Sequence, residues 1–266
     1  MLKKNLLKEK MNQAQKVIGS FFTLGSAACI EILSGTGLDF LLIDTEHGPF
    51  DLEDSLQYVM ACELHGITPL VRVKDSQRNS ILKMLDIGAM GLVVPNIKSV
   101  DEVKRTVEYG KFPPVGERGL GTGRKVCYGM EEDFQDLDRY FAWANRETLL
   151  IPQCETREAL DCIEEITALP GVDGIFIGSF DLSVSLGIAK QFDSDMFLDA
   201  VRRIRDACHT NGKFCWILGR TADAAADYLR TGFDGILAGD AGFLFQGAAE
   251  YVRSVREGHC ERKQND

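Results

Sequence analysis

The sequence predicts a single-domain (β/α)8 barrel over residues 1–266, with a helical extension at residues 1–16. Three observations support this fold class. Short apolar runs alternate with amphipathic stretches eight times along the chain, and strict alternation of this kind indicates a parallel sheet. The length of 266 residues is close to the ~250 residues of one such barrel. The turn at residues 24–27 lacks the glycine-rich phosphate motif of an open doubly wound sheet, the alternative architecture.

The elements follow in order. The predicted strands cover residues 17–23, 38–44, 67–73, 90–95, 149–153, 172–177, 214–218 and 235–238. The helices that follow them cover residues 27–34, 51–65, 78–87, 100–109, 157–169, 195–210, 221–231 and 241–256. The near-continuous apolar run at 38–44 is typical of a strand buried on both faces. A long loop with an extra helix is predicted at 110–148, and the polar residues 257–266 are expected to be disordered.

The composition argues against several classes of function. The formal net charge is -10 and no basic cluster follows the first ten residues, so we expect no nucleic-acid partner. No apolar run reaches the ~18 residues of a membrane span, and the first ten residues lack the apolar core of a signal peptide. None of the eight cysteines forms a Cys-x-x-Cys pair. We therefore expect a cytoplasmic protein that acts on small molecules and has no membrane partner.

Polar side chains gather at the ends of neighbouring predicted strands, where barrel active sites form. The residues in question are Asp44, Glu46, His47, Arg72, Asn96, Gln153, Glu155, Ser179 and Asp181. This concentration on one rim predicts a catalytic site.

Each of the main candidates also has a purely structural interpretation. Glu155 and Asp181 offer the hard oxygen ligands that Mg²⁺ and Mn²⁺ prefer, but both precede helices and are equally placed to cap them. His47 suits a general base, although a single histidine is more often structural. Arg72, inside an apolar strand, either faces a developing enolate oxygen or pairs with a buried acid.

The glycine-rich stretch at 116–123 contains Arg118. A loop of this length is more often functional or disordered than idle. It is consistent with a mobile lid, a subunit contact or a flexible insertion.

Six ordered blocks resemble the HpcH/HpaI family of metal-dependent class II pyruvate aldolases, of the 2-dehydro-3-deoxyglucarate and 4-hydroxy-2-oxoheptanedioate aldolase type. The blocks are LLIDTEHGPF (41–50), PLVRV (69–73), LDIGAMGLVVPNI (85–97), FPPVGERGLGTG (112–123), IPQCETREAL (151–160) and GVDGIFIGSFDLSVSLG (171–187). Together the similarity runs from about residue 19 to residue 239.

The resemblance implies that Glu155 and Asp181 bind a divalent metal, Mg²⁺, Mn²⁺ or Co²⁺, with no organic cofactor. Pyruvate would chelate this metal, and Arg72 would hold its keto or enolate oxygen. His47 would move the proton, oriented by Asp86.

Further roles are implied for the surrounding residues. Asp44, Glu46 and Gln153 would support the inner groups or hold water. The backbone around Ser179, Phe180 and Asp181 would receive the pyruvate carboxylate, although Phe180 departs from the smaller residue that relatives often have. Arg118 would lie near a subunit contact and shape the aldehyde pocket, in a homo-oligomer that is usually a hexamer built as a trimer of dimers.

The expected reaction is reversible retro-aldol cleavage of a 4-hydroxy-2-oxo acid to pyruvate and an aldehyde through a metal-stabilised enolate, an aldehyde-lyase activity. Four alternatives stay open. They are decarboxylation of an oxaloacetate-type acid at the same enolate site, a Schiff-base mechanism at Lys74, chemistry on acyl-CoA thioesters, and a non-catalytic metabolite-binding barrel.

Overall fold

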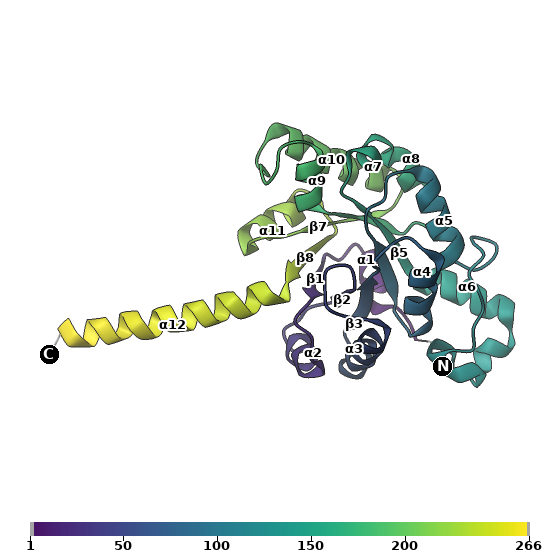
Figure 1. Ribbon diagram of the computed structural model, residues 1–266, viewed down its shortest axis with the longest axis horizontal. Helices are drawn as coiled ribbons and strands as arrows, with labels where there is room; N and C mark the ends of the chain where they lie inside the picture. Colours follow the sequence, from purple (N-terminus) through teal and green to yellow (C-terminus); the bar gives the residue numbers. More distant parts are fainter. Residues whose placement is uncertain (1–2, 265–266) are drawn as a thin grey trace.

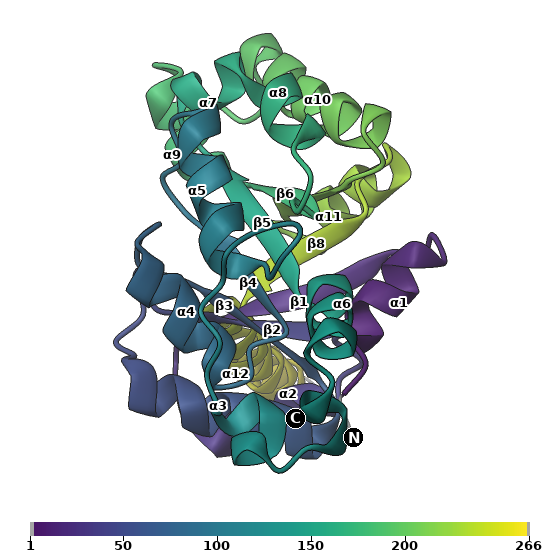
Figure 2. The ribbon, with the colours of Figure 1, turned by 90° about the vertical axis from the view of Figure 1, so that its right-hand side faces the viewer.

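The computed structural model describes residues 3–264, and it describes side chains as far as Glu257. Eight parallel strands close into one barrel in sequential order, and helices surround it (Figures 1 and 2), which confirms the predicted fold class. The strands are β1 Val17–Phe22, β2 Phe40–Asp44, β3 Thr68–Arg72, β4 Gly91–Val94, β5 Leu149–Cys154, β6 Gly174–Ile177, β7 Phe214–Leu218 and β8 Gly235–Gly239. The helices are α1 Leu6–Asn12, α2 Ala27–Ser34, α3 Leu52–His65, α4 Arg78–Asp86, α5 Val100–Gly110, α6 Leu137–Glu147, α7 Arg157–Asp161, α8 Ile163–Ala168, α9 Ser179–Ser185, α10 Asp195–Thr210, α11 Ala222–Arg230 and α12 Asp240–Gln264.

The barrel interior is a packed core, because alternate residues of each strand point inward. Phe40 of β2 stacks on Trp216 of β7 with ring centroids 4.8 Å apart. Gly19 of β1 makes room for this pair, since a Cβ there would overlap the Phe40 ring. The interior is therefore filled below the rim, and within the barrel a ligand would bind at the carboxyl ends of the strands.

The helix α1 closes the amino-terminal end of the barrel. Its Leu7 and Met11 are buried against the interior cluster. The Asn5 side chain caps α1 by accepting from Lys8 N at 3.1 Å, and it donates to the Met90 carbonyl at 3.1 Å. This end of the barrel is therefore sealed, as the predicted amino-terminal helix implied.

The segment at 110–148 is packed against the barrel. It contains two 3₁₀ turns, η1 Arg124–Gly129 and η2 Glu132–Gln135, before α6. Phe112, Val126, Tyr140, Trp143 and Ala144 form a hydrophobic cluster of their own. This core argues against a flexible insertion.

Three elements differ from the sequence-based prediction. The helix expected over 157–169 is divided into α7 and α8, because Cys162 has non-helical backbone angles. The short helix α9 lies where we expected only a loop. The helix α12 extends to Gln264, into the segment 257–266 for which we expected disorder, and residues 265–266 lie outside the described residues.

The helix α12 leads away from the barrel instead of packing on it (Figure 1). Every residue from 241 to 257 is exposed. Within the described residues, we find no helix whose length and apolar content would let it span a bilayer.

Candidate active site

The floor of the candidate site is an ion pair between two neighbouring strands. Asp44 of β2 and Arg72 of β3 stand in register at the last inward-facing position of each strand. Arg72 donates from Nε to Asp44 Oδ1 at 2.9 Å and from Nη2 to Asp44 Oδ2 at 2.6 Å. Both residues are buried: 7% of Arg72 and 2% of Asp44 is exposed. Arg72 therefore pairs with a buried acid, as one of its two interpretations proposed, and this bidentate pair fixes the plane of the guanidinium.

The loop after β2 is folded around the same carboxylate. Asp44 Oδ1 accepts from the backbone N–H of Glu46 at 3.1 Å and from that of His47 at 3.3 Å. Glu46 in turn brings its Oε2 to 3.1 Å from Arg72 Nη1. His47 is exposed, with its Nε2 3.8 Å from Glu46 Oε2. Glu46 and His47 are thus held on the rim beside Arg72.

Glu155 lies further around the mouth, at the end of β5, with the strand β4 between it and β3. Its Oε1 accepts from the backbone N–H of Asn96 at 2.5 Å, and its Oε2 accepts from the Gln153 side-chain amide. Gly178 allows this arrangement, because a Cβ there would lie 2.6 Å from Glu155 Oε2 and 2.8 Å from Gln153 Nε2. Two donors and one close backbone approach hold a buried carboxylate in one orientation.

The capping interpretation of the two candidate metal ligands does not hold. The N-cap of α7 is Thr156, whose hydroxyl accepts from Ala159 N at 3.1 Å. The N-cap of α9 is Gly178, and Asp181 lies in the first turn of that helix, exposed toward solvent. Glu155 and Asp181 are therefore available for a ligand.

The electrostatics of the mouth favour a bound cation. Burial raises the pKa of Glu155 above its ordinary value, and the nearby charges of Glu46 and Asp181 raise it further, while hydrogen bonds from Asn96 and Gln153 lower it. Burial likewise raises the pKa of Glu46, against the lowering effect of Arg72. The negative charges of Glu46 and Asp181 repel that of Glu155, and a positive ion between these carboxylates would relieve the repulsion.

Unsatisfied polar atoms also suggest a ligand at this place. In the described part of the chain, Gln153 Oε1 and Ser179 Oγ are buried without a hydrogen-bond partner. Buried polar groups of this kind usually have a partner, so water, an ion or a substrate is expected beside them. The residues present thus fit a divalent cation with two carboxylate ligands, Glu155 and Asp181, with water and substrate oxygens completing its shell. Over the same described residues, no three His, Cys, Asp or Glu side chains gather closely enough to hold a metal without such additional ligands.

Asp86 is not near His47 in this chain. It ends α4, and Arg118 Nη2 donates to its Oδ1 at 2.8 Å. Because α4 returns antiparallel to the strands, its last residue lies at the amino-terminal end of the barrel, while His47 lies at the carboxyl end. Within one chain Asp86 and His47 therefore do not meet, and Arg118 is equally remote from the mouth of its own barrel, so the orienting role of Asp86 stays a prediction.

Two contributors to the site had no assigned role in the sequence. The ring of Phe21 lies under the Arg72 guanidinium, with 4.7 Å from the Arg72 Cζ to the ring centroid. Asn96 has a positive φ of 54° that aims its N–H at Glu155. The Pro95-Asn96 pair at a strand end indicates this turn, because Asn tolerates the left-handed backbone region. Phe21 is an apolar residue inside a strand, and nothing in the sequence indicates that its ring contacts Arg72.

A comparison with known families addresses the identity of this arrangement. The model of the HpcH/HpaI aldolase/citrate lyase family matches residues 17–248, which span the barrel and the start of α12. The chain belongs to this family. The family assignment confirms the resemblance stated above and makes the protein an aldolase-type enzyme.

Three relatives illustrate the range of the HpcH/HpaI family. A hydroxypyruvate/pyruvate aldolase of Chromohalobacter salexigens is 37% identical over 87% of this chain and 89% of its own. A 2-keto-3-deoxy-L-rhamnonate aldolase of Shigella dysenteriae serotype 1 is 32% identical over 89% and 90% of the two chains. Among solved structures, the citrate synthase SbnG has a TM-score of 0.85 and 28% identity, over 95% of this chain and 98% of its own.

Proposed function

We propose that the protein cleaves a 4-hydroxy-2-oxo acid reversibly into pyruvate and an aldehyde, as an aldehyde-lyase. The observation that carries the proposal is the presence at one barrel mouth of two carboxylates that cap no helix, Glu155 and Asp181, together with the fixed guanidinium of Arg72. An oxo acid has two adjacent oxygens that suit a cation on one side and an arginine on the other.

The cleavage needs three things from the site. A proton must leave the C4 hydroxyl, the C3–C4 bond must break, and the resulting negative charge must rest on the C2 oxygen. A divalent cation held by Glu155 and Asp181 would supply positive charge beside that oxygen. Mg²⁺, Mn²⁺ and Co²⁺ all accept oxygen ligands of this kind, and no organic cofactor is required for this reaction.

The chain's own residues would do the rest. Arg72, whose orientation is fixed by Asp44, places a second positive charge where the enolate develops. His47 is exposed on the rim, and there it accepts the C4 proton and exchanges it with water. The unpaired Gln153 Oε1 and Ser179 Oγ hold water or a substrate oxygen. Phe180, exposed at the start of α9, borders the space left for the aldehyde.

The structure gives little support to the Schiff-base alternative. A lysine nucleophile needs a desolvated amine, and Lys74 is exposed to solvent beyond the end of β3. Decarboxylation through the same enolate uses the same groups, so an experiment must separate it from aldol cleavage.

The decisive experiment is exchange of the pyruvate methyl protons in D₂O, followed by NMR with Mg²⁺ and with EDTA. We expect exchange that needs Mg²⁺ and is lost in Glu155→Gln. The matched control is Glu158→Gln, an exposed carboxylate three residues along, which should leave exchange unchanged. No exchange above background with bound Mg²⁺ would refute the proposal, and release of CO₂ from oxaloacetate without aldehyde turnover would favour the decarboxylase.

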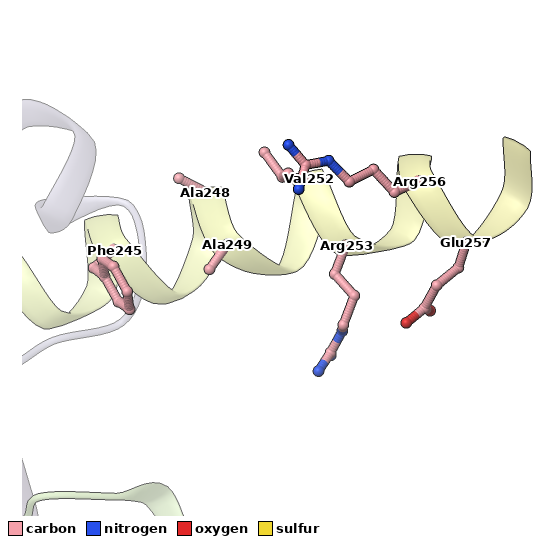
Figure 3. A pocket seen from close by; sticks show the side chains of 7 residues that line it. All are labelled: Phe245, Ala248, Ala249, Val252, Arg253, Arg256 and Glu257. Atoms are coloured by element: carbon pink, nitrogen blue, oxygen red, sulfur yellow. The ribbon is translucent and has the colours of Figure 1, made fainter.

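We also propose that the working form is a homo-oligomer, with a hexamer of three dimers as the expected state. The helix α12 carries apolar side chains on successive turns, as Figure 3 shows for Phe245, Ala248, Ala249 and Val252. At its root an apolar groove of about 360 Å³ runs between α11, β8 and β1. An exposed apolar stripe and an open groove on one chain favour packing of α12 against a second copy.

The oligomer also offers a role for Asp86 and Arg118, which lie far from the mouth of their own barrel. Asp86 and Arg118 can act on a barrel mouth only if a neighbouring copy brings them to it. Light scattering after size exclusion tests the association, and Phe245→Glu should shift the protein toward the monomer. A wild-type monomer at micromolar concentration would contradict this proposal.

A further inference from the structure

The mouth of the barrel has a second side that the proposed chemistry leaves open. Arg72 ends β3, Glu155 follows β5, and Asp181 lies in the first turn of α9, after β6. Since the strands close in sequential order, the ends of β7, β8 and β1 form the remaining arc of the rim. With pyruvate bound between Arg72 and the two carboxylates, the space for the aldehyde is expected on this arc.

Arg220 stands at the end of β7 on this arc. Leu218 packs with the residues of the barrel interior, and Gly219 faces outward, because a Cβ there would lie 2.7 Å from the Ala225 Cβ of α11. Gly219 N still donates to the Leu237 carbonyl at 2.8 Å, so the strand pairing continues beyond Leu218. Side chains alternate along a strand, and Arg220 therefore comes next on the inward-facing side, above Leu218.

Aromatic contacts hold the Arg220 guanidinium in place. Its Cζ lies 4.0 Å from the centroid of the Phe192 ring. Phe192 is buried and packs edge-on against Phe180 at the start of α9, with ring centroids 5.3 Å apart, and against Phe197 of α10. A flat cation that lies on a buried ring keeps its N–H edge free for a ligand.

The Arg220 guanidinium has no acidic partner in the described part of the chain. It is exposed, and no ion pair or side-chain hydrogen bond engages it there. The carboxylate of Asp240, which follows β8, accepts three hydrogen bonds from the loop after β1. Burial raises the pKa of Tyr228, Arg220 lowers it and Asp193 raises it, so both charges act on that hydroxyl, yet Asp193 does not pair with Arg220.

We propose that Arg220 binds an anionic group on the aldehyde half of the substrate. The preferred substrate is then a 4-hydroxy-2-oxo acid with a second acidic group, a carboxylate or a phosphate, at its far end. This inference rests on the proposed function and narrows its substrate class. A guanidinium donates two parallel hydrogen bonds to either group. On β7 the second acidic group also lies away from Glu155 and Asp181, whose negative charges would repel it nearer the metal.

Calorimetric titration of the full chain in the presence of Mg²⁺ tests the proposal without turnover. The probes are 2-oxoadipate, its analogue 2-oxohexanoate with an uncharged end, and 5-phosphono-2-oxopentanoate. None of them has a C4 hydroxyl, so none can be cleaved. We expect the two probes with a second acidic group to bind about tenfold or more tightly than 2-oxohexanoate, because charge-assisted hydrogen bonds are strong. The tighter of these two assigns the group as carboxylate or phosphate.

Substitutions of Arg220 separate its charge from its packing. Arg220→Met should lower the affinity for both acidic probes by about tenfold and leave that for 2-oxohexanoate unchanged. Arg220→Lys should keep part of the preference, and Arg220→Glu should reverse it. The matched control Arg105→Met removes an exposed arginine of α5 that likewise has no ion pair among the described residues, and it should bind all three probes like wild type.

The outcomes distinguish this inference from the proposed function. Equal wild-type affinity for 2-oxoadipate and 2-oxohexanoate, or an unchanged preference in Arg220→Met, would overturn the role of Arg220, while binding of pyruvate would leave the aldolase proposal intact. Equal weakening in Arg105→Met would reduce the preference to general attraction by surface charge and would also overturn it. If neither pyruvate nor any probe binds in the presence of Mg²⁺, the proposed function fails and this inference fails with it.

Discussion

Removal of the Asp44 charge tests whether the ion pair under the mouth positions Arg72. In Asp44→Asn the shape is kept, but the two hydrogen bonds of 2.9 and 2.6 Å lose their charged acceptor. Breaking a buried pair by removing one partner costs about 3–5 kcal/mol. Glu46 Oε2, at 3.1 Å from Arg72 Nη1, compensates part of this, so we expect a loss of about 2–4 kcal/mol in unfolding free energy.

Thermal unfolding measures this loss directly. For a chain of this size 1 kcal/mol shifts the melting temperature by roughly 2–4 °C, so Asp44→Asn should melt roughly 5–15 °C below wild type. The double variant Asp44→Leu/Arg72→Met removes both charges and should be more stable than Asp44→Asn, because it leaves no buried charge without a partner.

The catalytic consequence of the same change is separable from stability. Below the melting temperature of the variant, pyruvate proton exchange should fall because the guanidinium is no longer fixed in one plane. A melting temperature within about 2 °C of wild type, or a double variant less stable than Asp44→Asn, would refute the view that this pair is a buried, structure-forming contact.

Three further outcomes follow from the structure. Gly178→Ala should lower pyruvate exchange by about 10²-fold with little change in far-UV circular dichroism, because a Cβ 2.6 Å from Glu155 Oε2 must displace that carboxylate; unchanged exchange would contradict the close approach. Burial of the Lys125 amine lowers its pKa to about 7, so between pH 7 and pH 10 the unfolded chain binds more protons than the folded one and stability rises with pH. When the free energy of unfolding is measured by urea titration, Lys125→Met should lack this rise. An identical pH dependence in the wild type and the variant would contradict the assignment of the rise to Lys125. Mixed oligomers of His47→Ala and Asp86→Ala should recover part of the activity that each variant lacks, and no recovery after verified subunit exchange would mean that the two residues do not act across a subunit contact.

The barrel could be predicted from the sequence because its strands are buried on both faces. Runs such as the one that became β2 are apolar without interruption, and each is followed by a periodic helical stretch. Closure of the sheet then brings the strand ends together, which is why Asp44 and Arg72 meet in register and Glu155 faces them.

Local features with weak patterns were not predictable in the same way. The helix α9 has only seven residues and follows β6 closely, so the sequence has no apolar periodicity there that would predict a helix. The role of Gly178 depends on the approach of a side chain from β5, a contact between residues distant in sequence. The direction of α12 could not be predicted from the sequence either, because an amphipathic helix has the same apolar pattern whether it packs on its own barrel or on another chain.

Asp86 illustrates the limit of inference from resemblance. A motif indicates that a carboxylate is present, but the fold decides which surface carries it. Because helices return antiparallel to the strands, the last residue of α4 lies at the amino-terminal end of the barrel, and its partner in this chain is Arg118. Arg118 keeps its Nε and Nη1 buried and without hydrogen-bond partners among the described residues. Since buried guanidinium donors are rarely left unpaired, an ordered water is expected beside them. A second copy cannot reach Arg118, whose side chain is 1% exposed, so the member of the pair that is accessible to another chain is Asp86, whose side chain is 33% exposed.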